Sequence, residues 1–158
     1  MLVSGHAVVI GDDVDTDMII AGRYLRTTDR SVWVEHAFED YDLRIAGRLN
    51  GSVLVAGKNI GCGSSREQAV VALKESGVRA VVAPSFARIF FRNCVNLGLY
   101  VFEAEVICND GDTVSFDTVE SYVTTPAGVY EAKPLSPRMR ELLSAGGLNA
   151  YLSSEGGQ

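Results

Sequence analysis

Residues 52–102, SVLVAGKNIGCGSSREQAVVALKESGVRAVVAPSFARIFFRNCVNLGLYVF, decide the fold. Three short apolar runs alternate there with two longer amphipathic stretches, and turn residues separate them. The pattern predicts, in chain order, strand Ser52–Ala56, helix Ser64–Ser76, strand Arg79–Ala83, helix Ser85–Asn96 and strand Leu99–Phe102. Connections this short join parallel strands through right-handed crossovers. We therefore expect an α/β fold with a parallel β-α-β-α-β core.

Both predicted helices have an apolar side and a glycine at the C-terminal end. Gly77 ends the first helix and Gly98 the second, because glycine is the preferred residue just past a helix end. The inward-facing positions that we expect are Ala69, Val70, Ala72 and Leu73 in the first helix, and Phe86, Ile89, Phe90 and Val95 in the second.

The flanking sequence adds strands and helices to this core. Before it come an apolar strand at Ala7–Ile10, an acidic loop at Asp12–Asp17, and one or two short helices within Ser31–Ala46. After Asp112 the sequence pattern changes from alternating strands and helices to successive short strands. We expect strands at Thr113–Phe116 and Ser121–Thr124, a helix at Pro137–Ala145 with proline in its first turn, and a frayed tail over residues 153–158. The chain is then a single domain, residues 1–158, with antiparallel strands added to the parallel core.

Composition limits the partners that the chain can have. The 158 residues are 47% hydrophobic and 22% charged, with a net charge of −6, values typical of a soluble globular protein. No basic stripe is present to bind nucleic acid, and no apolar run is long enough to span a membrane. The N-terminus has no signal-peptide pattern, so we expect a cytoplasmic location.

The cysteines and histidines do not indicate a metal site. Cys62, Cys94 and Cys108 are widely spaced and form no C-x-x-C pair, and His6 and His36 have no neighbouring ligand residue. We therefore expect this chain to bind no metal cluster by itself.

The segment Gly57–Glu67 has the composition of an anion-binding loop between a strand and a helix. Ser64 and Glu67 match the S-x-x-E capping box, so we expect the helix to begin at or next to Ser64. The N–H groups and the dipole of a helix start favour an anion, and the guanidinium of Arg66 can grip a carboxylate or phosphate.

Nucleotide-binding motifs do not fit this loop. A P-loop needs a lysine before Ser64, and a dinucleotide fingerprint needs a third glycine where Arg66 stands. Two interpretations remain equally open from the residues alone. Either the loop binds a small anionic molecule, or Ser64 merely caps a helix while Arg66 pairs with a surface acid.

Longer motifs resemble a known family. Gly61–Ala69 (GCGSSREQA) resembles the G-x-G-S-S-R-E signature of the aconitase superfamily swivel domain, and Ser85–Asn93 (SFARIFFRN), followed by Asn96–Leu99, resembles that family's S-F-A-R-I-F-x-R-N segment. Gly11–Asp17 with Ile19-Ile20 is similar to the D-x-D-T-D-x-I-I opening of isopropylmalate isomerase small subunits, and Ala145–Leu148 also fits. The resemblance covers most of residues 5–152, departs at Ala21 where a proline is common, and implies a swivelling β/β/α domain.

The resemblance implies a reaction and roles for individual residues. Members of the family isomerise hydroxy acids by eliminating water and adding it back at the neighbouring carbon. The implied roles are an alkoxide base for Ser64 and binding of the substrate carboxylate for Ser65 and Arg66. A [4Fe-4S] cluster that acts as Lewis acid belongs to a partner large subunit, so this chain is expected to be inactive without that partner.

Substrate choice depends on Tyr24–Thr27, which occupies the position of the family's substrate-recognition loop. A loop that binds an isopropyl group should be apolar. Arg26 suits a second carboxylate instead, as in homoaconitate. The alternative is that Arg26 points to solvent. We place isopropylmalate first and keep homoaconitate, or both substrates, as the alternative. Two rivals of another class are a non-catalytic module that binds an organic acid and a purely structural assembly subunit.

Overall fold

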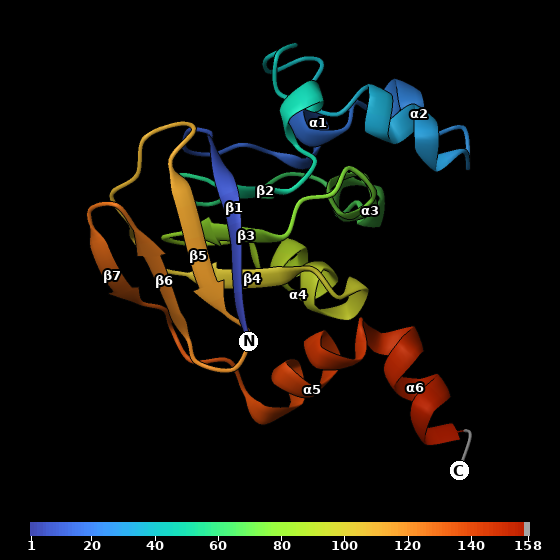
Figure 1. Ribbon diagram of the computed structural model, residues 1–158. Helices are drawn as coiled ribbons and strands as arrows, with labels where there is room; N and C mark the ends of the chain where they lie inside the picture. The colour runs from blue at the N-terminus through green and yellow to red at the C-terminus, as the bar shows by residue number, and fades with distance from the viewer. Residues whose placement is uncertain (157–158) are drawn as a thin grey trace.

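A seven-stranded mixed sheet forms the centre of the computed structural model, which describes residues 1–156 (Figure 1). The spatial order of the strands is β4-β3-β2-β1-β5-β6-β7. Strands β1 to β4 pair in parallel, and β5 to β7 pair in antiparallel fashion. Their bounds are β1 Leu2–Val9, β2 Ser52–Val55, β3 Ala80–Ala83, β4 Tyr100–Glu103, β5 Thr113–Asp117, β6 Tyr122–Thr125 and β7 Gly128–Glu131.

Helices lie on one side of the parallel strands, and β5 to β7 curl toward the other side (Figure 1). The α-helices are α1 Thr16–Ile19, α2 Arg30–Glu35, α3 Glu67–Glu75, α4 Arg88–Leu97, α5 Pro137–Ala145 and α6 Leu148–Gly156, with short 3-10 helices η1 Gly22–Tyr24 and η2 Ala46–Arg48. The crossover helices α3 and α4 pack against each other and against the sheet. α5 and α6 continue this layer past α4.

Strands β2 and β3 are buried on both faces, which is why their sequences are continuous apolar runs. Successive side chains of a strand point to opposite faces. In β2, Val53 and Val55 belong to the core enclosed by the curled sheet, whereas Leu54 belongs to the core under the helices. In β3, Val82 belongs to the core enclosed by the curled sheet and Val81 to the core under the helices. The two cores are therefore separated by one layer of backbone.

The curl brings the two ends of the sheet together. The Lys133 N–H, just past β7, donates to the Glu103 carbonyl of β4 at 2.9 Å. The Thr125 hydroxyl donates to the Ile107 carbonyl at 2.8 Å. The β6–β7 end of the sheet thus donates hydrogen bonds to β4 and to the segment that follows it.

The expected α/β fold with a parallel core and added antiparallel strands is confirmed. Helix α5 has the predicted bounds, and Gly98 ends α4 as predicted. The strand β7 and the helix α6 were not predicted from the sequence. Helix α6 continues through Gly156, so residues 153–156 are helical, and the last two residues of the predicted tail lie outside the described residues.

Two expectations for the helices were wrong. Helix α3 begins at Glu67 and not at Ser64, because the backbone of Arg66 is extended and Arg66 occupies the N-cap without a side-chain hydrogen bond. Ser64 instead offers its carbonyl, which accepts the Thr16 hydroxyl at 2.7 Å. Ile89 does not face the core: 52% of it is exposed, because it lies at the start of α4 beside a surface cleft.

Candidate active site

The loop between β2 and α3 lies at the carboxyl ends of the parallel strands, where open α/β sheets bind ligands. Two neighbouring segments hold its backbone. The Gly61 N–H donates to the Val14 carbonyl at 2.8 Å, and the Thr16 N–H donates to the Cys62 carbonyl at 3.0 Å. On the other side, the Ala87 N–H donates to the Ile60 carbonyl at 2.9 Å. Residues that follow β1, β2 and β3 therefore meet at this loop.

Gly61 is required by the close approach of helix α4. Its φ of +83° lies in the left-handed region, and a Cβ atom there would be 2.0 Å from Cγ of Phe90. Phe90 is only 2% exposed and has no room to move aside. This contact fixes the distance between the loop and the start of α4.

A cleft of about 310 Å³ opens between this loop and the start of α4. Its lining residues are Thr16, Gly61, Cys62, Gly63, Ser64, Ser65, Arg66, Ala87, Arg88, Ile89, Phe90 and Asn93. Three of the four predicted site residues, the consecutive Ser64, Ser65 and Arg66, therefore line the cleft. The structure adds two polar side chains from α4, Arg88 and Asn93, to which the sequence analysis gave no role.

The electrostatics of the cleft favour an anion. Helices α3 and α4 both begin beside it, and neither N-cap, Arg66 or Ala87, supplies a side-chain hydrogen bond to the first turn. Such uncapped N–H groups and the positive ends of two helix dipoles attract negative charge. The guanidinium groups of Arg66, which is paired with Asp17, and of Arg88 also line the cleft, so a carboxylate suits it.

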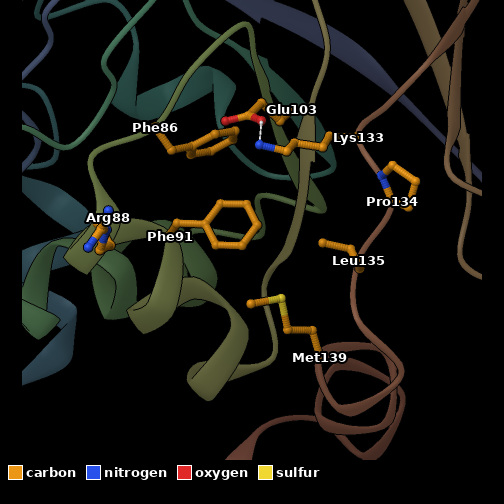
Figure 2. Close-up of a pocket in the computed structure, with 8 residues that line it drawn as sticks. All are labelled: Phe86, Arg88, Phe91, Glu103, Lys133, Pro134, Leu135 and Met139. Atoms are coloured by element: carbon orange, nitrogen blue, oxygen red, sulfur yellow. Dashed lines mark ion pairs between the residues drawn. The ribbon is translucent and has the colours of Figure 1, made fainter.

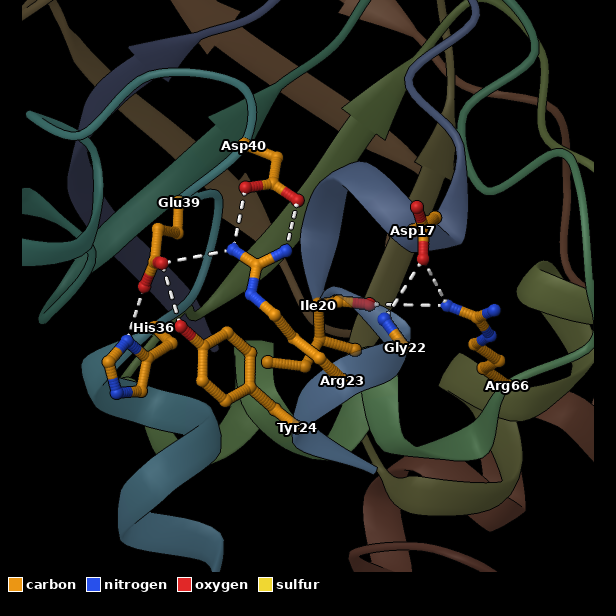
Figure 3. Close-up of polar contacts among 9 residues, drawn as sticks. All are labelled: Asp17, Ile20, Gly22, Arg23, Tyr24, His36, Glu39, Asp40 and Arg66. Carbon is orange, nitrogen blue, oxygen red and sulfur yellow. Dashed lines mark hydrogen bonds and ion pairs between the residues drawn. The ribbon is translucent and has the colours of Figure 1, made fainter. Parts of the chain in front are cut away.

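Arg66 is already bound to a carboxylate of the chain. Its Nη1 donates to Oδ1 of Asp17 at 2.7 Å, and the Gly22 N–H donates to the same oxygen at 3.0 Å (Figure 3). The Arg66 guanidinium, and after it the Gly22 N–H, hold the pKa of Asp17 below its ordinary value. The pairing of Arg66 with a surface acid, one of the two interpretations left open above, therefore holds in the free chain.

Arg26 lies apart from this cleft. It follows η1, its side chain is exposed, and it is not among the residues that line the cleft. Within residues 1–156 no hydrogen bond or ion pair of the Arg26 side chain is formed. The structure therefore places Arg26 as an unengaged cation on the surface, two residues beyond η1.

A second hollow of about 390 Å³ adjoins the cleft through Arg88. Figure 2 shows Phe86 and Phe91 on one side of it, facing Leu135 and Met139 on the other. An ion pair between Lys133 and Glu103, 3.5 Å apart, lies at one end. This hollow is larger than the cleft but is lined by none of the predicted site residues, so the cleft is the candidate active site.

Sequence reasoning missed Asp17, Arg88 and Asn93. All three stand inside the motifs on which the family resemblance rests, so position within a motif was the available signal. Their residue types alone do not single them out, because exposed Asp, Arg and Asn are common on protein surfaces.

The cysteines are not arranged to hold a metal. Cys62 lines the cleft, Cys94 is buried in the core under the helices, and Cys108 packs against the core within the curled sheet. No group of three or more His, Cys, Asp or Glu side chains in the described part of the chain could hold a metal ion. An iron–sulfur cluster therefore has no ligand set among these residues.

No helix within residues 1–156 has both the length and the apolar character that crossing a membrane requires.

Comparisons with known proteins show which family the chain belongs to. The chain matches the family model of the aconitase C-terminal domain over residues 13–105. It is 47% identical to the 3-isopropylmalate dehydratase small subunit of Moorella thermoacetica, a match that covers 97% of this chain and 96% of that protein. It is 46% identical to the methanogen homoaconitase small subunit of Methanothermobacter thermautotrophicus, over 97% and 92% of the two chains.

A solved structure is similar over almost the whole chain. The crystal structure of a 3-isopropylmalate dehydratase from Methanocaldococcus jannaschii matches with a TM-score of 0.91 and 43% sequence identity, and covers 99% of this chain and 96% of that one. Identities and coverage of this size confirm the resemblance deduced from the motifs. The chain therefore belongs to the aconitase family and, within it, to the hydro-lyase small subunits of the isopropylmalate dehydratase and homoaconitase type.

Proposed function

We propose that this chain is the small subunit of a hydro-lyase that interconverts 2-isopropylmalate and 3-isopropylmalate by removing water and adding it back. The observation that carries the proposal is the grouping of Ser64, Ser65 and Arg66 on one anion-attracting cleft. Sequence identity near 47% to proteins named as such small subunits supports it.

In this proposal Ser64 removes the proton from the carbon next to a substrate carboxylate. The hydroxide on the neighbouring carbon leaves as the carbon–carbon double bond forms, and water then adds back in the opposite orientation. A serine alkoxide is a strong base that bulk water would protonate, so it needs nearby positive charge. The uncapped start of α3 and the Arg66 guanidinium supply that charge at Ser64.

Ser65 and Arg66 hold the substrate carboxylate and stabilise the charge that develops when the proton leaves. Arg66 forms this kind of contact already, because it donates to the Asp17 carboxylate in the free chain. A substrate carboxylate entering the cleft would take one of the guanidinium's remaining donors or replace Asp17.

The leaving hydroxide requires a Lewis acid, and within residues 1–156 no group of three or more His, Cys, Asp or Glu side chains is arranged to hold a metal ion. We assign that role to a [4Fe-4S] cluster on the partner large subunit, and we propose that the chain is active only in complex with it. Residues 1–158 act in that complex as one swivel domain.

The substrate is decided by the segment that carries Arg26. Because Arg26 forms no ion pair within the described residues, it is available for the second carboxylate of homoaconitate. This observation favours a homoaconitase, or a small subunit that serves both substrates, as the second candidate. Relatives of nearly equal identity carry either name and do not separate the two.

The test is reconstitution of this chain with its large subunit under anaerobic conditions, with isopropylmalate and homoaconitate assayed separately. Ser64→Ala should lower kcat by about 10²- to 10⁴-fold, the usual contribution of a general base, with the complex still formed. Ser144→Ala, an exposed serine on α5, is the matched control and should leave kcat unchanged. Full activity of Ser64→Ala would exclude Ser64 as the base.

The same assay separates the rival functions. Turnover by the wild type that Ser64→Ala abolishes, in a complex of unchanged stability, would exclude a structural assembly subunit and a non-catalytic binding module. Activity on neither substrate with a stable complex would refute both substrate assignments and leave the fold and family standing.

A further inference from the structure

A polar network holds Tyr24, which lies two residues before Arg26 (Figure 3). None of the network's side chains lines the cleft. Its members are Arg23, Tyr24, His36, Glu39 and Asp40. The Glu39 carboxylate is its centre. It accepts the Tyr24 hydroxyl at 2.7 Å and Nη2 of Arg23 at 3.0 Å, and its other oxygen accepts Nδ1 of His36. Asp40 adds a two-pronged contact to Arg23, at 2.8 and 2.7 Å.

Tyr24 is fixed at its ring, its hydroxyl and its backbone. The ring stacks on His36 with the ring centres 4.1 Å apart, and the Arg23 guanidinium lies 4.9 Å from the ring centre. Nε1 of the buried Trp33 donates to the Tyr24 carbonyl at 3.0 Å. Three independent contacts therefore determine where the chain leaves η1.

The other end of η1 is tied to the cleft. The Gly22 N–H and Nη1 of Arg66 donate to the same oxygen of Asp17, at 3.0 and 2.7 Å. The Arg66 guanidinium also packs against Gly22: a Cβ atom built there would lie 3.5 Å from Nη2. The three residues Gly22, Arg23 and Tyr24 thus connect Arg66 on one side to Glu39 and Asp40 on the other.

Arg26 lies in the chain between two anchored residues. Tyr24 is the first, and Asp29 is the second, because its carboxylate caps α2 by accepting the Ser31 N–H at 3.0 Å. Arg26 itself forms no contact of this kind among residues 1–156. Four residues, 25–28, join the two anchors, and a chain this short has little reach, so moving the Tyr24 anchor moves the place that Arg26 can occupy.

Stability alone does not account for the network. The side chains of Arg23, Glu39 and Asp40 are 51%, 28% and 44% exposed. Ion pairs this exposed contribute little to the free energy of unfolding, because water screens them and ordering long side chains costs entropy. Charge-assisted hydrogen bonds do fix geometry, however, and the geometry that they fix here is that of the segment leading to Arg26.

We propose that Glu39 is a positioning residue for substrate selection: by holding Arg23, Tyr24 and His36 it sets where Arg26 is presented relative to Arg66. The inference rests on the proposed function, in which Arg26 and Arg66 read the carboxylates of the substrate. Glu39 contacts neither the cleft nor the substrate and acts only through η1.

The experiment uses the reconstituted complex and measures kcat and KM for isopropylmalate and homoaconitate separately. Glu39→Ala should raise KM for the substrate that Arg26 binds by about tenfold and leave kcat within about twofold of the wild type. Glu39→Gln keeps an oxygen that accepts from Tyr24 and Arg23, so it should restore most of the wild-type KM. Asp42→Ala removes a neighbouring exposed ion pair with Arg44 and is the matched control.

A double-mutant cycle identifies the route of the effect. If Glu39 acts through Arg26, Glu39→Ala should not change KM further when Arg26→Ala is already present. An equal rise of KM in both backgrounds would overturn the proposal, as would an unchanged KM in Glu39→Ala. Urea unfolding of each variant shows whether the chain is folded. If Glu39→Ala unfolds, Tyr24→Phe, which removes only the hydroxyl that donates to Glu39, should raise the same KM, and an unchanged KM would overturn the proposal.

A second measurement separates this inference from the proposed function. If the wild-type complex turns over neither substrate, the proposed function fails and amide hydrogen exchange decides the positioning role. Faster exchange at residues 25–28 in Glu39→Ala, with none in Asp42→Ala, would support the role of Glu39 in fixing the segment. Unchanged exchange there would overturn it.

Discussion

Nη1 of Arg66 lies 2.7 Å from Oδ1 of Asp17, a residue 49 positions earlier in the chain. The cation assigned to substrate binding is therefore neutralised in the free chain by an acid that is itself 59% exposed. An incoming anion competes with this acid for the guanidinium.

Replacing Asp17 by asparagine should strengthen anion binding by the isolated chain. Asparagine retains an oxygen that can accept from Gly22 and Arg66, so the geometry is kept while the competing charge is removed. We expect affinity for a dicarboxylate such as malonate to rise a few-fold in isothermal titration calorimetry, and Arg66→Ala to abolish binding. Asp42→Asn is the control. Weaker binding by Asp17→Asn would mean that the carboxylate orients the guanidinium more than it competes with the ligand.

Three glycine-to-alanine variants should separate backbone strain from steric conflict. Gly47→Ala meets no atom within 4 Å and should change the free energy of unfolding by less than about 0.5 kcal/mol. Gly111→Ala also has open space but a φ of +86°, so it should cost about 1 kcal/mol. Gly61→Ala adds the conflict with Phe90 and should cost more than about 2 kcal/mol. Urea unfolding checks the order, and a Gly61→Ala variant as stable as Gly47→Ala would contradict it.

The Glu39 network predicts a pH dependence of stability. The Tyr24 hydroxyl, then His36 and Arg23, lower the pKa of Glu39 from 4.5 to about 2. A carboxyl group whose pKa is lowered on folding contributes stability above its unfolded pKa and loses it as the pH falls through the folded value. The difference in unfolding free energy between wild type and Glu39→Gln should thus be constant above about pH 5 and shrink toward pH 2. Urea unfolding across that range measures it, and a difference that grows on acidification would contradict it.

Cys94 and Cys62 should differ in reactivity. Cys94 is fully buried, and burial raises the pKa of its thiol, so it should react with iodoacetamide only in the unfolded chain. Burial, and then Asp15 and Asp13, raise the pKa of Cys62, so its alkylation should be slow at neutral pH and faster as the pH rises. Peptide mapping by mass spectrometry gives both rates.

Alkylated Cys62 should block the cleft that it lines. We expect the modified chain to lose activity in the reconstituted complex, whereas Cys62→Ala should keep activity and resist the reagent. Cys108→Ala is the control, because Cys108 packs against the core within the curled sheet. Loss of activity in Cys62→Ala would give the thiol a role that we do not assign to it.

Local patterns predicted the fold well where one rule acts alone. The short apolar segments around Leu54 and Val81 are buried on both faces, as is typical of parallel strands. Proline at position 137 and the glycine after Ala145 set the ends of α5 by backbone geometry, without help from distant residues.

The errors occurred where a distant partner overrides the local pattern. Ser64 and Glu67 have the spacing of a capping box, but the Ser64 carbonyl is held by Thr16, so the helix starts later. Ile89 follows the helical apolar period and is nevertheless exposed beside the cleft. The grouping of Ser64, Ser65 and Arg66 was foreseen from the family motif, while the partnership of Arg66 with Asp17 depends on tertiary contacts that the spacing does not encode. The catalytic roles of these residues stay predictions.

Strand β1 lies in the middle of the sheet and precedes both of its neighbouring strands in the chain, so it is synthesised before either of them. It pairs on one side with residues 52–55 and on the other with residues 113–117. A nascent chain that has reached the end of β4 already holds every residue that lines the cleft. Its β1 still has an open edge, and Ala7 and Val53 lack the cover of Phe116. The antiparallel strands that follow therefore add no residue to the lining of the cleft. Their part is to cover the open edge of β1 and the apolar face beside it, which would otherwise be exposed to other chains.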